Sequence, residues 1–391
     1  MDRYREGLIQ LFNQTGFPED SFYIRKAFAG RKIIVYGAGE CCHWPFMEIV
    51  VGIYGFLPAL VLDRAFKKGD RYMGIPAASP FDYEPNEDEQ RNAVVVICVG
   101  RVDCHEEIIT LLKGLGFQNI IRLHDVYEIH NPFNQPPELE RSGFDFYLNR
   151  KNRIVSCMDL FSDEQSREIY FQVIFTHMTR KGAPLPASPG REQYFPKDLP
   201  LRRGYSKFIC CGADTGSIIR LLNELNGQVM SVACIEPDPW LFAELAKYLS
   251  QHGAAVAENI VAFPCAAYSR NAMMPFTSAN HDGDREIPTG FGSRILEGGE
   301  AFIQTITLDD TLPGFNPTFI CMDAEGAELE ALKGAKGILL KNSPDLAICV
   351  YHSPEHLWEI PLYLNSLGVG YQFYLRNYTS LISETVLYAA T

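Results

Sequence analysis

The stretch Lys207–Gly216 (KFICCGADTG) decides the fold of this chain. It begins as a short apolar run rich in residues that favour strands and ends as a turn with two glycines. Helical spacing follows at 215–226, and a second apolar run at 231–236 ends in Glu236. Buried strands that end in glycine turns and alternate with helices are typical of a parallel sheet covered on both faces. The stretch therefore predicts the first strand, turn and helix of an open α/β domain.

The rest of residues 203–391 continues this alternation. We expect strands at 207–211, 231–236, 260–266, 318–323, 346–351, 371–376 and 384–390. We expect helices at 215–226, 239–251 and 327–341, and a further element at 356–367 that separates the fifth strand from the last two. The last two strands are so close in sequence that they must form an antiparallel hairpin. Residues 270–317 interrupt the pattern with a long, polar, glycine-rich stretch, which we interpret as a lid or a substrate loop.

The N-terminal part of the chain repeats the signal at Lys32–Gly39 (KIIVYGAG). Strands are expected at 33–37, 56–63, 93–100 and 119–123, with helices at 44–54 and 104–115. The prolines between 181 and 201 indicate a connector, because they cannot continue a helix or a central strand. The fold class is therefore α/β with two tandem doubly wound domains, the second a seven-stranded sheet that ends in a β-hairpin. The expected boundaries are 1–135 with an N-terminal helix, a helical and proline-rich connector at 136–202, and 203–391.

The composition excludes several classes of function. The 391 residues carry a formal net charge of -13, which repels phosphate backbones and anionic lipid surfaces. No apolar run reaches the ~20 residues that a membrane span needs, and the polar start does not resemble a secretion signal. The 11 cysteines include no Cys-x-x-Cys pair, so we expect reduced thiols. We predict a cytoplasmic protein that binds neither nucleic acid nor membrane, and a homodimer is compatible with the sequence.

The turn after the first C-terminal strand has the features of a cofactor site. Gly212, Ala213, Asp214 and Gly216 stand at the carboxyl end of a strand and at the start of a helix, where backbone amides are free to meet a ligand. Glu236 ends the next strand, in the position from which an acid accepts both hydroxyls of an adenosine ribose. The alternative is that Glu236 caps the helix at 239–251, although Asp238 is better placed to do so.

A second group of polar residues follows the central strands. Asp323 and Glu325 leave a buried apolar strand together, where carboxylates are costly to desolvate and so suggest function. His352 ends the next strand and can act as a general base near neutral pH, with a structural histidine as the alternative. Glu328 stands in the first turn of the following helix, where an acidic side chain interacts favourably with the helix dipole. Magnesium would suit these oxygens, but the acids also fit a helix start, and we assign no metal.

The C-terminal half resembles the FkbM family of S-adenosylmethionine-dependent methyltransferases. The resemblance rests on Tyr194–Pro196, the turn 212–216, Ile235–Pro237, Thr307–Asp310, Met322–Glu328, Leu332–Ala335, Tyr351–His352, Tyr374–Arg376 and Leu387–Ala389. It implies a methyltransferase-type fold, S-adenosylmethionine as cofactor, and methyl transfer to a hydroxyl, often of a saccharide or a secondary metabolite. The family's cofactor turn corresponds to Gly212, Ala213 and Gly216, and its ribose acid to Glu236.

The resemblance assigns provisional roles along the site. The adenosine is expected over Glu236, Pro237, Cys265 and Ala266, and the methionine end between Gly212 and Asp323. His352 is the expected base. Asp323 and Glu325 are expected to position the acceptor, a small-molecule or saccharide hydroxyl.

One departure from the family leaves alternatives open. Cys210 stands where the family usually has an acid that helps to hold the cofactor's amino group, and a thiol cannot form the same charge-assisted bond. Either Asp214 or Asp323 substitutes, or cofactor binding is weak, or the domain is a decayed copy that only binds. A further alternative uses the N-terminal turn Gly37–Gly39 with Asp63, as an NAD-dependent oxidoreductase or a nucleotide-sugar-binding protein, although a third glycine is missing.

Overall fold

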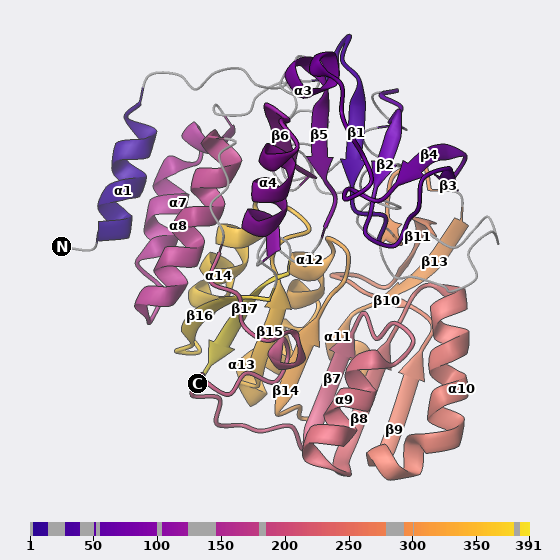
Figure 1. Cartoon of the computed structure of the whole chain (residues 1–391). Coiled ribbons are helices and arrows are strands. Elements are labelled where there is room, and N and C mark those ends of the chain that lie inside the picture. Colours follow the sequence, from indigo (N-terminus) through magenta and orange to yellow (C-terminus); the bar gives the residue numbers. More distant parts are fainter. Residues whose placement is uncertain are drawn as a thin grey trace. The chain divides into compact units, whose positions relative to one another are not determined.

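The computed structural model describes residues 3–14, 28–39, 51, 55–99, 104–123, 146–179, 185–278, 293–299, 301–378 and 384–391. The chain forms two compact units. The larger consists of Met1–Glu6, Lys151–Tyr170 and Pro186–Thr391, and the smaller of Gly7–Arg150 and Phe171–Leu185. In Figure 1 the strands of the smaller unit are indigo to purple, and those of the larger run from pink to yellow. The helix expected at 44–54 falls almost entirely outside the described residues.

The smaller unit is built on a six-stranded sheet in the order β3-β4-β2-β1-β5-β6. Its strands are β1 Ile33–Tyr36, β2 Leu60–Leu62, β3 Asp70–Tyr72, β4 Ile75–Ala78, β5 Val94–Ile97 and β6 Asn119–Arg122. Only β3 is antiparallel to its neighbour. The helix α4 His105–Gly114 matches the one expected at 104–115, whereas the short helix α3 Glu87–Asn92 was not expected. The hairpin of β3 and β4 was not anticipated, because its short strands are largely exposed and give no apolar run.

The larger unit contains the predicted seven-stranded sheet, in the order β16-β17-β15-β14-β7-β8-β9 (Figure 1). Its strands are β7 Lys207–Cys211, β8 Val229–Ile235, β9 Ala257–Phe263, β14 Phe319–Met322, β15 Asp345–Cys349, β16 Gln372–Asn377 and β17 Thr385–Ala390. The strands β9, β8, β7, β14 and β15 are parallel, and β17 joins β15 and β16 in antiparallel pairs. The α/β fold with a closing hairpin is therefore confirmed.

Helices cover both faces of this sheet. They are α9 Ser217–Asn226, α10 Pro239–Val256, α12 Glu328–Lys333, α13 Lys336–Asn342 and α14 His356–Ser366. The strand face that carries Phe208, Cys210 and Phe319 packs against α9 and α10. The single helix expected at 327–341 is two helices, which are separated at Gly334 and Ala335. A Cβ at Gly334 would lie 1.9 Å from the carbonyl oxygen of Tyr268.

Residues 270–317 are not the simple loop that the sequence suggested. Three strands of this stretch, β11 Ala272–Thr277, β12 Arg294–Ile295 and β13 Ala301–Ile306, join β10 Ala266–Ala267 in a four-stranded sheet in the order β10-β13-β11-β12. The short helix α11 Leu308–Thr311 follows. Residues 279–292 of the stretch interpreted as a lid or a substrate loop lie outside the described residues.

The remaining helices are α1 Arg3–Phe12, α7 Lys151–Met158, α8 Glu164–Thr179 and the 3-10 turn η4 Gly190–Glu192. The side chain of Arg376 on β16 ties two preceding segments to the sheet. It donates to Asp163 over 2.7 Å and to Asp198 over 2.6 Å, and the residue is only 3% exposed. Within the described part of the chain, no helix has the length and apolar character needed to cross a membrane.

We expect Arg376→Met to lower the free energy of unfolding by about 2–4 kcal/mol, because it leaves Asp163 and Asp198 without their cation at a partly buried site. The matched control is Arg191→Met, which breaks an ion pair with Glu224 that is exposed on both sides and should cost about 0.5 kcal/mol or less. Urea unfolding followed by circular dichroism measures both. Equal losses for the two variants would contradict a structural role for Arg376.

Candidate active site

A pocket of about 400 Å³ opens at the carboxyl edge of the seven-stranded sheet. The strands β8, β7 and β14 end there, which is where open α/β sheets bind ligands. Its charged lining residues are Asp214, Glu236, Arg294, Asp323, Glu325 and Glu384. Among its other lining residues are Gln193, Tyr194, Gly212, Pro237, Ala266 and Tyr351. Among the described lining residues, Arg294 is the only basic one, so the pocket is strongly acidic.

The turn after β7 is held tightly against its neighbours. The Gly212 amide donates to the Ile235 carbonyl over 2.9 Å, and Gly212 has a φ of 80°. A Cβ at Gly212 would lie 1.7 Å from the carbonyl oxygen of Asp323. Only glycine fits both the left-handed backbone and this close approach. The turn and the end of β14 therefore meet directly at the floor of the pocket.

Glu236 lies in the pocket and is only 4% exposed. Its two carboxylate oxygens accept the backbone amides of Asp214, over 2.8 Å, and Asp238, over 2.9 Å. Burial raises the pKa of Glu236 to about 7. Asp238 caps α10 by accepting the amides of Trp240 and Leu241, as expected, so Glu236 is not needed as the cap. Each carboxylate oxygen accepts one backbone amide and has further acceptor capacity, and Glu236 lines the pocket.

Asp323 follows β14 and meets a cluster of polar groups. Its carboxylate accepts the hydroxyl of Tyr194 over 2.9 Å and that of Tyr351 over 3.4 Å. Glu384, just before β17, accepts a hydrogen bond from the side-chain Nε2 of Gln193 over 2.5 Å. Burial and then the charge of Asp323 raise the pKa of Glu384 to about 7. Two carboxyl groups thus share one end of the pocket.

Three of the pocket acids adopt a backbone conformation that is unfavourable for their residue type. Asp214, Glu325 and Glu384 have φ values of 47°, 47° and 62°. Left-handed backbone costs an L-residue with a side chain about 1–2 kcal/mol. The fold therefore holds these carboxylates at the pocket against a local strain.

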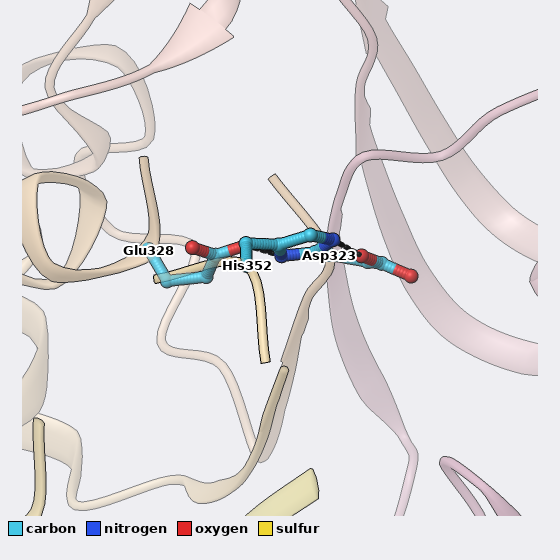
Figure 2. A group of neighbouring side chains, drawn as sticks. All are labelled: Asp323, Glu328 and His352. Atoms are coloured by element: carbon cyan, nitrogen blue, oxygen red, sulfur yellow. Dashed lines mark hydrogen bonds and ion pairs between the residues drawn. The ribbon is translucent and has the colours of Figure 1, made fainter. Parts of the chain in front are cut away.

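His352 lies between Asp323, which lines the pocket, and the fully buried Glu328 (Figure 2). Its Nδ1 lies 2.7 Å from Glu328 Oε1, and its Nε2 lies 3.3 Å from Asp323 Oδ1 and 3.6 Å from Glu325 Oε2. Burial alone would lower the pKa of His352, but the charges of Glu328, Glu325 and Asp323 raise it to about 10. The ring is therefore an imidazolium within an acidic cluster at neutral pH.

The role of His352 as a general base stays a prediction. The acidic neighbours raise the pKa of the ring, and His352 is not among the residues that line the pocket. Glu328 begins α12, as expected of a helix-start acid, and it also pairs with His352. It is fully buried, its pKa is lowered by His352 although burial opposes this, and it accepts the Ala324 amide over 2.8 Å.

The structure brings most of the other expected site residues together. The pocket is lined by Gly212, Asp214, Glu236, Pro237, Ala266, Asp323 and Glu325. Three expected cofactor residues do not line it. Ala213 and Cys265 are buried, and Gly216 is the N-cap of α9 with a φ of 89°. The specific roles of all these residues remain predictions.

Cys210 does not face the pocket. Its side chain is completely buried in the core between the sheet and the helices α9 and α10. A hydrogen bond with the Cys321 thiol raises the pKa of the Cys210 thiol, and burial raises it further. Cys210 is therefore a neutral core residue, and pocket acids such as Asp214 and Asp323 lie where a ligand can meet them.

Sequence reasoning missed three polar residues of the site. Glu384 and Arg294 carry no local motif and reach the pocket only through the tertiary fold. Tyr194 was quoted only as part of a family resemblance, yet its hydroxyl bonds Asp323 and lies 3.4 Å from the sulfur of Cys349. An isolated tyrosine before a strand gives no signal for such a contact.

Comparison with known proteins agrees with this geometry. A family model of the methyltransferase FkbM domain matches residues 211–373. The solved structure of methyltransferase FkbM from Methylobacillus flagellatus KT aligns with a TM-score of 0.72 and 20% identity, over 99% of each chain. At this identity the alignment shows a shared fold.

Fibrillarin from Aeropyrum pernix, solved with S-adenosyl-L-methionine, aligns with a TM-score of 0.29 and 11% identity, over 51% of this chain and 73% of that one. A score this low carries no argument. No curated protein matches the chain. The larger unit carries a methyltransferase FkbM domain, and the protein is a methyltransferase. The resemblance found in the sequence is confirmed.

We expect Gly212→Ala to destabilise the protein by at least ~2 kcal/mol, because the new methyl group meets Asp323 and the backbone there is left-handed. Gly190→Ala is the matched control, since Gly190 also lines the pocket but a Cβ there meets nothing within 4 Å. Thermal and urea unfolding measure both variants. Comparable stability of the two would show that the turn can move away from β14.

Proposed function

We propose that the pocket binds S-adenosylmethionine and that the protein transfers its methyl group to a hydroxyl of a saccharide or a secondary metabolite. The observation that carries this proposal is the place of Glu236, buried beside the Gly212 turn within a methyltransferase FkbM domain. The backbone amides of Asp214 and Asp238 fix the orientation of the Glu236 carboxylate. Its remaining lone pairs suit the two adjacent hydroxyls of a ribose.

The order of the strands suggests how the cofactor would lie. Glu236 follows β8, Gly212 follows β7 and Asp323 follows β14, and these strands are neighbours in the sheet. A cofactor with its ribose at Glu236 would cross the Gly212 turn and bring its sulfonium toward Asp323. Because Cys210 is buried away from the pocket, we assign the cofactor's ammonium group to Asp323, one of the two substitutes open from sequence.

The acceptor would then occupy the end of the pocket beyond Asp323. Glu325, Tyr351 and Glu384 line this end and offer hydrogen-bond partners for a hydroxylated molecule. During transfer the acceptor oxygen bonds to the methyl carbon while the carbon–sulfur bond breaks and sulfur keeps its electron pair. The hydroxyl proton passes to a pocket carboxylate, and the site supplies alignment of oxygen, methyl and sulfur.

The acidic pocket bears on the choice of acceptor, and the free thiols bear on the location of the protein. A pocket with five carboxylates and one guanidinium favours a neutral acceptor over a phosphorylated one. The nine described cysteines are free thiols. We include a cytoplasmic location in the proposal, since reducing compartments keep thiols in this form.

A second candidate function is nucleotide binding by the smaller unit. There the Ala38 amide donates to Asp63 over 2.9 Å, and the Gly37 amide donates to the Leu62 carbonyl over 2.8 Å. The larger unit has a similar pair of bonds. The Asp214 amide donates to Glu236, and the Gly212 amide donates to the Ile235 carbonyl. This shared arrangement favours binding of a nucleoside at Asp63.

We expect Glu236→Gln to weaken binding of S-adenosylhomocysteine by about 10–100-fold, because the ribose loses a charged acceptor. In the unmodified protein, affinity should fall as the pH drops below about 7, since Glu236 then holds a proton. Calorimetry between pH 6 and 8.5 tests this. The variant should lose the pH dependence, and Glu244→Gln on the exposed face of α10 should behave as the unmodified protein. Absence of binding to the unmodified protein would refute the proposed cofactor.

Calorimetry with NAD tests the second candidate. We expect weak binding that Asp63→Asn removes and Glu236→Gln leaves intact, because the two acids belong to separate units. No heat with NAD, alongside retained binding of S-adenosylhomocysteine, would leave methyl transfer as the only proposed function.

A further inference from the structure

A buried carboxylate beside the pocket connects the four-stranded sheet to the helix α10. Asp238 is completely buried, and its backbone amide donates to Glu236 over 2.9 Å. We infer that Asp238 is a positioning residue of the cofactor pocket: its side chain holds the end of β11 and the start of β12, and these strands supply an apolar wall for the cofactor's base. This inference rests on the proposed binding of S-adenosylmethionine.

The two side-chain oxygens of Asp238 bond to different segments of the chain. Oδ1 accepts the backbone amides of Trp240 over 2.9 Å and Leu241 over 3.3 Å, and these bonds cap α10. Oδ2 accepts the hydroxyl of Ser278 over 2.6 Å and that of Ser293 over 2.8 Å. A helix N-cap needs only one side-chain oxygen, so the bonds to the serines are additional to the cap. Hydrogen bonds to a carboxylate are stronger than those between neutral groups.

The two serines stand at the ends of a short pair of strands. Ser278 directly follows β11, and Ser293 directly precedes β12. The strand β12 lies at the edge of the four-stranded sheet, and its register with β11 consists of two residue pairs. Pairing this short gives a strand little stability of its own. The bonds of Ser278 and Ser293 to one oxygen of Asp238, which we call the serine clamp, therefore hold the two strands to each other and to α10.

The serine clamp lies next to residues that line the pocket. Phe276 and Ile295 are partners across β11 and β12, and both line the pocket. They pack with Ala266, another lining residue, in one apolar cluster. The neighbouring pair, Thr277 with Arg294, stands between them and the serines. Ligand pockets are lined mainly by apolar side chains, and such a wall suits the face of a nucleobase.

Hydrogen bonds connect the acid proposed to bind ribose with this apolar wall. Glu236 accepts the Asp238 amide, Asp238 accepts the two serine hydroxyls, and the serines adjoin the strands that carry Phe276 and Ile295. Loss of the bonds at Oδ2 should let the wall move relative to Glu236, while the cap of α10 stays in place. We therefore expect weaker ligand binding without loss of the fold, because a binding site depends on the groups that support its lining residues.

Calorimetry of the full chain with S-adenosylhomocysteine tests the serine clamp. Asp238→Ser keeps one capping oxygen for α10 but lacks the second oxygen, and we expect it to weaken binding about tenfold. The double variant Ser278→Ala with Ser293→Ala should weaken binding to the same extent. Adding Asp238→Ser to this double variant should cause no further loss, since all three changes remove the same bonds.

Two matched variants serve as controls. Ser278→Thr keeps the hydroxyl at a half-buried position and should bind S-adenosylhomocysteine as the unmodified protein does. Ser250→Ala removes an exposed serine hydroxyl of α10 that bonds within its own helix, and it should also leave binding unchanged. Thermal unfolding identifies a variant that has lost its fold. If Asp238→Ser does not fold, the serine variants decide the test.

The outcomes separate this inference from the proposed function. Equal binding of S-adenosylhomocysteine by the unmodified protein and the double alanine variant would overturn the inference and leave the proposed cofactor in place. Weaker binding by Asp238→Ser, with normal binding by the double alanine variant, would assign the effect to the helix cap and also overturn it. Absence of binding to the unmodified protein would refute the proposed cofactor and the inference together.

Discussion

The carboxylate of Glu236 holds together the two backbone segments from which the pocket is built. One oxygen accepts the amide of Asp214 in the turn after β7, and the other accepts the amide of Asp238 at the start of α10. The same turn brings Gly212 close to the backbone of Asp323. Position and chemistry are therefore coupled: the acid that we propose to bind ribose also sets the distance between β8, β7 and the acids after β14.

The sequence was sufficient for those parts of the fold that local patterns encode. Buried strands such as Lys207–Cys211, the glycine turn that follows, and the short gap before β17 all have signals within a few residues. The second sheet was missed because β11 and β13 are partly exposed strands with mixed side chains. The break between α12 and α13 was missed, and the close approach of Gly334 to the Tyr268 carbonyl is a contact far away in sequence that no local pattern encodes.

The same distinction between local patterns and distant contacts holds for the residues of the site. Sequence placed Asp323, Glu325 and His352 at one sheet edge, because strand ends can be read from apolar runs. It could not show which groups pair with one another. Glu328 begins α12, as expected, but the pattern could not show that its side chain is buried against His352. Glu384 reaches the pocket only because β17 lies beside β15.

The left-handed backbone of Asp214, Glu325 and Glu384 carries a consequence for engineering and evolution of this chain. Glycine at any of the three positions would release strain, so a screen for thermostability alone would tend to select it. Each such gain would remove a charge from the cavity. Stability and ligand chemistry are thus opposed at these three points, and a more robust variant of this methyltransferase should be sought elsewhere in the fold.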